Sequence, residues 1–282
     1  MIVKGQGNRL SIQATGPKAL SICGVTDTAN FQIFNISSGS VSSILIRLNL
    51  PPGIYYIKSS ISGGGVTESN VSNLNQPVFS APTLNIAKNF KFRVRLSSDC
   101  NLLSYLNSNN TPSIQVRVDY LGNYDLGNTI PFSIAVPSAQ YGTVSNLSFT
   151  GDIGTKFTRS IVIGNYGNGP LRELVLKRVN GKDIKTYFVG SGLTSYKGDT
   201  VETRYGPSFF KTIGNKDTFL DKNETFTVID SNVITGCKNL STNFELKWGC
   251  NNQFCQISKL SGSAIISNRT PNLKAIPLPV YP

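Results

Sequence analysis

The sequence contains no histidine, and this absence excludes a large part of enzyme chemistry. Ser-His-Asp and Cys-His nucleophile arrangements need an imidazole as the general base, and mixed Cys/His zinc sites need one as a ligand. Charged residues make up only 15% of the chain, whereas about 25% is usual for a soluble globular protein. The carboxylates, fifteen in all, are scattered along the sequence. Because proton transfer lacks its usual carriers, we predict that the chain is not an enzyme.

Long apolar runs are also missing. The sequence has no run of about 18 apolar residues, the length that a transmembrane helix needs, so we expect no membrane insertion. The opening residues, MIVKGQGNRLS, lack the apolar core of a signal peptide. The chain is nevertheless rich in Ser, Thr and Asn, which is typical of extracellular proteins, and its last eight residues include three prolines, as a linker would. We therefore expect a segment of a longer secreted, cell-surface protein, with Met1 added at its start.

The net charge of +12 raises the question of an anionic partner. The excess is divided between both halves of the chain, and its densest stretch is FKFRVRL at 90–96. Apolar residues alternate there with Lys91, Arg93 and Arg95, which predicts a strand with one buried face and one basic, solvated face. The aromatic–basic interleaving of an RNA-binding sheet does not accompany it. The pattern predicts no nucleic-acid partner and leaves open a weak attraction to an anionic polymer.

Short strand-like runs fill the sequence, separated by turn residues at roughly the eight-to-twelve-residue spacing of β-sandwiches. No stretch shows sustained helical periodicity, so we predict an all-β fold. Within VLKRVNGKDIKTYF, the dipeptide Asn180-Gly181 is a favoured two-residue turn between two alternating runs and predicts a hairpin. Small turn residues in VPSAQYG, 136–142, indicate a domain boundary. The prediction is two antiparallel β-sandwich domains in tandem, at 1–137 and 138–273, followed by a linker at 274–282.

A family resemblance becomes visible at LNLPPGIYYIKSS, 48–60. Two prolines end a strand, Gly53 permits the reversal, and an aromatic-rich strand begins. This pattern resembles the conserved repeat domain of bacterial surface proteins. With ITGC and FELKWGCNNQFCQ in the second half, the chain resembles very large secreted adhesins of gliding, Bacteroidetes-type bacteria, exported by the type IX route and built from tandem immunoglobulin-like domains. The resemblance covers most of the chain, and the missing signal peptide and remainder fit a fragment.

The resemblance implies a non-catalytic segment of an extracellular cell-surface adhesin, acting in surface attachment or gliding motility. Its partners would be adjacent domains of the same long chain, a polysaccharide or solid surface, or the secretion or motility machinery. The alternative is a carbohydrate-binding module or accessory domain of a secreted glycan-degrading enzyme, because exposed aromatic rings can stack on sugars. The candidate ligand contacts are Tyr55, Tyr56, Tyr120 and Tyr124. Neighbouring residues of a strand point to opposite faces, so at least one of Tyr55 and Tyr56 should belong to the core.

Five cysteines raise the choice between a metal site, a redox pair and disulfides. The spacing is not that of a Cys-x-x-Cys redox motif, and Cys237, Cys250 and Cys255 alone lack a fourth zinc ligand. If NFELKWGC and CQISKL are adjacent antiparallel strands, NNQF is a four-residue hairpin loop that places Cys250 opposite Cys255. We therefore predict a Cys250–Cys255 disulfide and, as a second disulfide, Cys23–Cys100. Cys237 would stay free or pair outside the segment.

The remaining candidates for acid–base chemistry are carboxylates. Asp217, Asp221 and Glu224 lie in one short stretch, and Asp125 lies apart from them. A glycosidase needs two carboxylates that face each other across a sugar. The stretch could line a calcium site, but it lacks the alternating Asp-x-Asp/Asn-x-Asp/Asn-Gly pattern of a calcium loop. A solvated turn between strands is the favoured interpretation, so we predict no catalytic residue and no metal or other cofactor.

Overall fold

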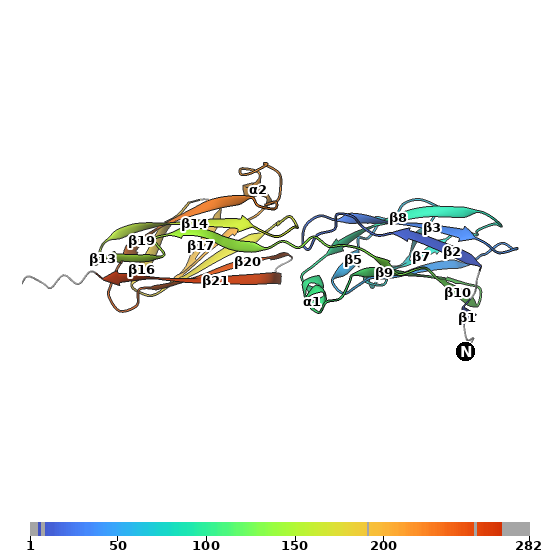
Figure 1. The fold of residues 1–282 in the computed structure, drawn as a ribbon, viewed down its shortest axis with the longest axis horizontal. Coiled ribbons are helices and arrows are strands. Elements are labelled where there is room, and N and C mark those ends of the chain that lie inside the picture. The colour runs from blue at the N-terminus through green and yellow to red at the C-terminus, as the bar shows by residue number, and fades with distance from the viewer. Residues whose placement is uncertain (1–4, 7–8, 191, 251–252, 267–282) are drawn as a thin grey trace, which may run out of the picture.

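The computed structural model describes residues 5–6, 9–190, 192–250 and 253–266. The chain forms an elongated body of two β-rich lobes that lie end to end (Figure 1). The strands of the first lobe come from 5–131 and those of the second from 139–266. Among the described residues, no helix is long and apolar enough to cross a membrane. Met1 and the linker predicted at 274–282 lie outside the described residues.

The first lobe is a sandwich of two sheets. Its seven-stranded sheet has the order β1-β10-β9-β4-β7-β6, with β11 paired to β9, and its four-stranded sheet has the order β2-β3-β8-β5. The strands of the larger sheet are β1 (Gly5–Gln6), β4 (Ile44–Asn49), β6 (Thr67–Asn70), β7 (Val78–Ala81), β9 (Ser113–Tyr120), β10 (Asn123–Leu126) and β11 (Ile130–Pro131). Those of the smaller sheet are β2 (Leu10–Thr15), β3 (Asp27–Asn35), β5 (Ile54–Tyr56) and β8 (Asn89–Ser98). A short helix, α1 (Asn101–Asn107), follows β8.

The second lobe repeats this plan. Its four-stranded sheet has the order β12-β14-β19-β16, and its six-stranded sheet has the order β13-β21-β20-β15-β18-β17. The strands of the smaller sheet are β12 (Ala139–Ser145), β14 (Lys156–Asn165), β16 (Ile184–Val189) and β19 (Thr225–Ile234). Those of the larger sheet are β13 (Ser148–Gly151), β15 (Leu174–Asn180), β17 (Leu193–Lys197), β18 (Thr200–Tyr205), β20 (Ser241–Cys250) and β21 (Gln253–Ile266). The short helix α2 (Pro207–Phe210) follows β18.

The predicted all-β fold of antiparallel sandwiches is confirmed, but the hairpin predicted at Asn180-Gly181 is wrong. β15 lies in the six-stranded sheet and β16 in the four-stranded sheet, so the chain crosses between the sheets here. The carboxylate of Asp183 fixes the crossing, because it accepts the backbone N–H groups of Lys238 (2.7 Å) and Asn239 (2.8 Å). An alternating apolar pattern suits two strands that face each other across a core as well as two that share a sheet. The pattern alone therefore does not distinguish the two arrangements.

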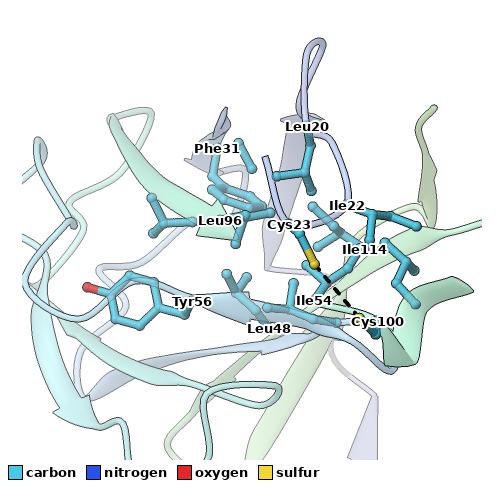
Figure 2. Packing of buried hydrophobic residues seen from close by; sticks show 14 of the residues in the cluster. Leu20, Ile22, Cys23, Phe31, Leu48, Ile54, Tyr56, Leu96, Cys100 and Ile114 are labelled. Carbon is cyan, nitrogen blue, oxygen red and sulfur yellow. Dashed lines mark hydrogen bonds between the residues drawn. The ribbon is translucent and has the colours of Figure 1, made fainter. Parts of the chain in front are cut away.

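The core of the first sandwich is apolar and aromatic. The predicted alternation in β8 is confirmed, since its residues are exposed and buried in turn from Asn89 to Leu96. The ring of Phe92 stacks on that of Phe31 of β3, with centroids 4.9 Å apart. Tyr56 meets Phe79 of the facing sheet edge-on at 5.1 Å. Figure 2 shows Phe31 and Tyr56 among the aliphatic side chains that fill the space between the sheets.

The core of the second sandwich contains charges. Arg178 of β15 and Asp230 of β19 form an ion pair of 2.9 Å between the facing sheets, and both side chains are completely buried. Arg159 of β14 is also fully buried, and its guanidinium lies 5.0 Å and 5.4 Å from the ring centroids of Phe157 and Phe244. Burial lowers the pKa of Arg159. Removing one partner of a buried ion pair typically costs about 3–5 kcal/mol, because the remaining charge is uncompensated.

One asparagine in each lobe holds the same kind of loop. Asn35 ends β3 and Asn165 ends β14, and both are buried. In each lobe the side-chain amide nitrogen donates to two backbone carbonyls, and the amide oxygen accepts the backbone N–H two residues later. The carbonyl acceptors are those of Gly39 (2.8 Å) and Leu84 (2.9 Å) in the first lobe and of Gly169 (2.7 Å) and Leu220 (2.8 Å) in the second. The two lobes are therefore two copies of one architecture.

We expect Asn165→Asp to destabilise the second sandwich by about 2–4 kcal/mol, because a carboxylate cannot donate to the two buried carbonyls and repels them. Trp248, the only tryptophan, is buried in this lobe, so urea unfolding followed by its fluorescence reports the change. Asn243→Asp makes the same chemical change at an exposed position and should alter the free energy of unfolding by less than about 0.5 kcal/mol. Equal effects in the two variants would contradict the role assigned to Asn165.

Candidate functional site

Four cysteines meet where the two lobes join. Cys23 precedes β3 and Cys100 precedes α1 in the first lobe, whereas Cys250 ends β20 and Cys255 lies in β21 of the second. Disulfides join Cys23 to Cys250 and Cys100 to Cys255, with Cα atoms 5.3 Å and 4.8 Å apart. The lobes are therefore linked by two covalent bonds in addition to the main chain. Figure 2 shows Cys23 and Cys100 pointing toward each other at the edge of the first core.

The predicted pairings, Cys250–Cys255 and Cys23–Cys100, are wrong, because each disulfide crosses between the lobes instead of staying within one. Cys23 and Cys100, which the sequence predicts to bond, are nevertheless neighbours in the first lobe. The Sγ atom of Cys23 lies 3.9 Å from that of Cys100 and 3.5 Å from that of Cys255. The sulfur atoms thus form one cluster, and the second lobe supplies the bonded partner of each first-lobe cysteine.

The hairpin between β20 and β21 explains why Cys250 and Cys255 do not bond. β21 begins at Gln253, which pairs directly with Cys250, so NNQF is not a four-residue loop. In the bulge that follows, Gly249 pairs with Phe254, and Cys255 is the extra residue. A Cβ atom on Gly249 would collide with the carbonyl oxygen of Gln253, so the bulge requires glycine. The two cysteines therefore occupy different levels of the hairpin and reach different partners.

The sulfur cluster is occupied by disulfides. The Sγ atoms of Cys23, Cys100 and Cys255 lie within 4.8 Å of one another. Zinc is bound by thiolates, and a disulfide sulfur is not one, so the oxidised cluster does not provide a metal site. Cys237 lies before β20, exposed and outside both disulfides.

A groove of about 910 Å³ lies beside the disulfides, with walls from both lobes, and is called here the junction groove. Tyr55 of β5 and Asp99 line its first-lobe side, and Arg204 and Phe209 line its second-lobe side. The side-chain amide of Asn101 donates to the Tyr55 hydroxyl at 3.4 Å. Burial raises the pKa of Tyr55, and so does its hydrogen bond with Asp99.

Three charged groups of the junction groove, Arg204, Glu173 and Asp99, already have partners. Arg204 lies 3.0 Å from Glu202 and 3.5 Å from Glu173. The carboxylate of Asp99 accepts a backbone N–H at the start of α1, at 2.9 Å. Tyr205 is buried in the wall, and burial raises its pKa to about 12. The polar lining of the groove suits hydrogen bonding to a polar ligand. The charged groups named here stabilise the walls of the groove through ion pairs and hydrogen bonds, and they are not arranged for proton transfer.

Two of the four candidate tyrosines belong to the core. Tyr56 and Tyr120 are buried, and their hydroxyls donate to Glu68 (2.6 Å) and Asp125 (2.8 Å). Burial raises the pKa of each tyrosine to about 12. The hydrogen bond from Tyr56 lowers the pKa of Glu68. These rings stabilise the first sandwich and cannot stack on a sugar without unfolding it.

The other two tyrosines are accessible but lie apart. Tyr55 lines the junction groove, as the alternation with the buried Tyr56 requires. Tyr124 lies on β10, where the guanidinium of Arg117 covers its ring at 4.1 Å from the centroid. The four candidates therefore do not form one aromatic platform.

The candidate carboxylates stabilise local structure. In the loop between α2 and β19, the side-chain amide of Asn215 donates to Asp217 (3.0 Å) and Asp221 (2.7 Å). Glu224 accepts the backbone N–H groups of Asn215 (2.8 Å) and Asp221 (2.9 Å). Burial, together with the charge of Asp217, raises the pKa of Asp221. Asp125 is buried in the other lobe, so the arrangement does not place a pair of carboxylates across a cleft.

No protein-family model matches the sequence, and no curated protein matches it. Among solved structures, the chain is similar to the C-terminal domain of the Streptococcus pyogenes antigen I/II-family protein AspA, with 8% identity and a TM-score of 0.44 over 94% of this chain and 100% of that one. It is also similar to the C-terminal domain of the Streptococcus agalactiae antigen I/II polypeptide BspA, with 10% identity and a TM-score of 0.43 over 91% and 99% of the two chains. Red sea bream transglutaminase matches with 11% identity and a TM-score of 0.28, over 92% of this chain and 32% of its own. These similarities are too low to assign a family or a function.

Peptide mapping of the purified protein without reductant should recover the Cys23–Cys250 and Cys100–Cys255 linkages. Replacing all four cysteines by Ser should leave the β-rich circular dichroism spectrum intact but increase the radius of gyration in small-angle X-ray scattering, because the main chain alone then joins the lobes covalently. Cys237→Ser is the matched control and should change neither measurement. Recovery of Cys23–Cys100 and Cys250–Cys255 linkages would refute the junction described here.

Proposed function

We propose that the chain is a non-catalytic spacer and display segment of a large extracellular cell-surface adhesin that acts in surface attachment. The observation that carries this proposal is the pair of disulfides between the lobes. Disulfides form and persist in oxidising compartments, which for most proteins lie outside the cytosol. A chain rich in Ser, Thr and Asn, with only 15% charged residues, fits the same location.

The disulfides also determine how tension would pass through the chain. β1 lies at the outer end of the first lobe and β21 ends at the outer end of the second, so a pull on both ends acts along the long axis (Figure 1). Cys23 and Cys250 are separated by 227 positions in the sequence, but the disulfide passes tension directly from one to the other. The residues between them are therefore outside the tensioned path. This protection suits a spacer that must keep its shape while a cell is pulled by flow.

The finer assignment follows the sequence resemblance. We place the adhesin among those of gliding, Bacteroidetes-type bacteria that use the type IX export route. Its partners are then adjacent domains of the same long chain, a polysaccharide or solid surface, and the secretion or motility machinery. The fold does not name the ligand, because function lies in sites placed on a fold. The carbohydrate-module alternative has less support, because its four candidate tyrosines are divided between the core and two separate surfaces.

Attachment of the producing cells under flow tests the proposed function. Cells that lack the protein should detach at a lower shear stress than cells that carry it. Cells with all four junction cysteines changed to Ser should show the same surface amount by antibody labelling but detach more easily, because the sandwiches then bear tension. Cys237→Ser should behave as the parent. If loss of the whole protein leaves attachment unchanged, or if antibodies reach it only in permeabilised cells, the adhesin assignment is wrong.

Pulling single molecules by their ends tests the tension path directly. With the disulfides intact, stretching should not release the residues between Cys23 and Cys250. Reduction should add roughly 80 nm of contour length, from 227 positions at about 3.5 Å each. The Cys237→Ser variant should give the same two values. A long extension of the oxidised protein would show that the clamp does not protect the lobes.

A further inference from the structure

The outer face of the four-stranded sheet in the first lobe carries a row of three cations. Lys91, Arg93 and Arg95 occupy alternate positions of β8, and all three are exposed. Alternate residues of a strand are about 6.6–6.8 Å apart and point the same way. The charges therefore form a regular line on the outer side of the sheet, whose inner side packs into the core.

Rows of polar side chains cross the sheet and end at these cations. Gln13 of β2 pairs with Gln32 of β3, which pairs with Lys91. In the adjacent row Asn30 of β3 pairs with Arg93. Directly opposite residues of antiparallel strands have Cβ atoms about 4.5–5.5 Å apart, so each row is continuous. We call the surface formed by Gln13, Asn30, Gln32, Lys91, Arg93 and Arg95 the basic face.

A shallow groove follows these rows. Its volume is about 660 Å³, and five residues of the basic face, all but Arg95, line it. Ser62 lies on its far side and forms an isolated bridge to Arg93. The groove is open along the sheet, which suits an extended polymer better than a compact small molecule.

The cations of the basic face lack compensating charge. Within the part of the chain that the structure describes, Lys91, Arg93 and Arg95 form no ion pair. The two guanidinium groups are held by neutral hydroxyls, since Arg93 Nε donates to Ser62 at 2.9 Å and Arg95 donates to Thr26 at 2.7 Å. Each contact uses one nitrogen of the guanidinium, and both residues remain exposed. The face is thus ordered and positively charged.

The sandwich fold does not require this row of charges. β19 occupies the equivalent place in the four-stranded sheet of the second lobe. Counted from the equivalent residues Asn35 and Asn165, its outward positions hold Thr227, Ile229 and Ser231 where β8 has cations. The basic face is therefore a property of the first lobe alone, added to an architecture that both lobes share.

We propose that the basic face binds an acidic polysaccharide built from uronate sugars. A planar carboxylate can accept two parallel N–H groups from a guanidinium, which Arg93 and Arg95 supply. The side-chain amides of Gln13, Asn30 and Gln32 both donate and accept, as sugar hydroxyls do. Single-stranded nucleic acids bind through stacking on aromatic side chains, which neither row contains. The combination of cations with flanking amides therefore favours an acidic glycan.

This inference rests on the proposed adhesive function and deepens it, because it names the kind of surface to which the segment attaches. Binding is measured with the purified 282-residue chain on immobilised polygalacturonate and alginate. We expect saturable binding that weakens with added salt, because the cations are exposed. The combined variant Lys91→Gln, Arg93→Gln, Arg95→Gln should raise the Kd by at least about tenfold.

Two matched variants separate a specific site from general attraction. The first variant lowers the net charge of +12 by the same three units as the basic-face variant, but at exposed positions of the second lobe: Lys182→Gln, Lys211→Gln and Lys222→Gln. It should change the Kd for polyuronate by less than about threefold. A variant with Gln13, Asn30 and Gln32 changed to Ala keeps the charge and should weaken polyuronate binding but not the weaker binding of duplex DNA. Neutral dextran should not bind.

The outcomes distinguish this inference from the proposed function. No binding to either polyuronate, equal losses in the two charge variants, or DNA binding as tight as polyuronate binding would overturn the inference. If it is overturned while cells lacking the protein still detach easily, the adhesive function stands with another ligand. If the basic face binds polyuronate but attachment does not depend on the protein, the adhesive function is wrong and the site stands.

Discussion

Covalent closure of the junction is the constraint on which the arrangement of the two lobes depends. Interfaces between domains of one chain are usually small, so relative motion is expected unless something prevents it. Here Cys23–Cys250 and Cys100–Cys255 lie side by side, with sulfur atoms of the two disulfides 3.5 Å apart, and hold the lobes together at the junction. In the chain-entropy model, closing a loop longer than about 100 residues contributes nearly 5 kcal/mol. The junction groove keeps its walls in place for the same reason.

The two lobes share an architecture but differ in how their sheets are held in register. Asn35 and Asn165 hold equivalent loops, so backbone geometry is common to both copies. The first core is filled by apolar and aromatic side chains, and the fit between their shapes fixes how one sheet lies on the other. The second contains the Arg178–Asp230 pair, which only one alignment of β15 on β19 can form. We interpret this pair as a fixed reference between the sheets, at the expense of desolvating both charges.

Local patterns in the sequence predicted the local features of the structure. Alternation required at least one of Tyr55 and Tyr56 to lie in the core, which the structure shows to be Tyr56, and it placed Lys91, Arg93 and Arg95 on the surface, because a strand has two faces whatever its neighbours are. The alternation of apolar residues does not show which distant strands or cysteines pair with each other. The hairpin expected at Asn180-Gly181 is a crossing between sheets, since apolar alternation is the same in both cases. Sequence spacing predicts the wrong disulfide pairs for two reasons. One bulge displaces Cys255 from Cys250, and each bonded partner lies in the other lobe, far away along the sequence.

The basic face and the junction are connected through the same two strands. Cys23 comes shortly before β3 and Cys100 shortly after β8, so two of the three strands that form the basic face have a disulfide at their junction end. The backbone N–H of Cys23 also donates to the carbonyl of Ser98, the last residue of β8, at 3.2 Å. A pull on a polymer bound to the basic face would load β3 and β8 along their length, in shear across their shared hydrogen bonds. That load would reach the second lobe through covalent bonds without first opening either sandwich, which is the mechanical property that an attachment segment needs.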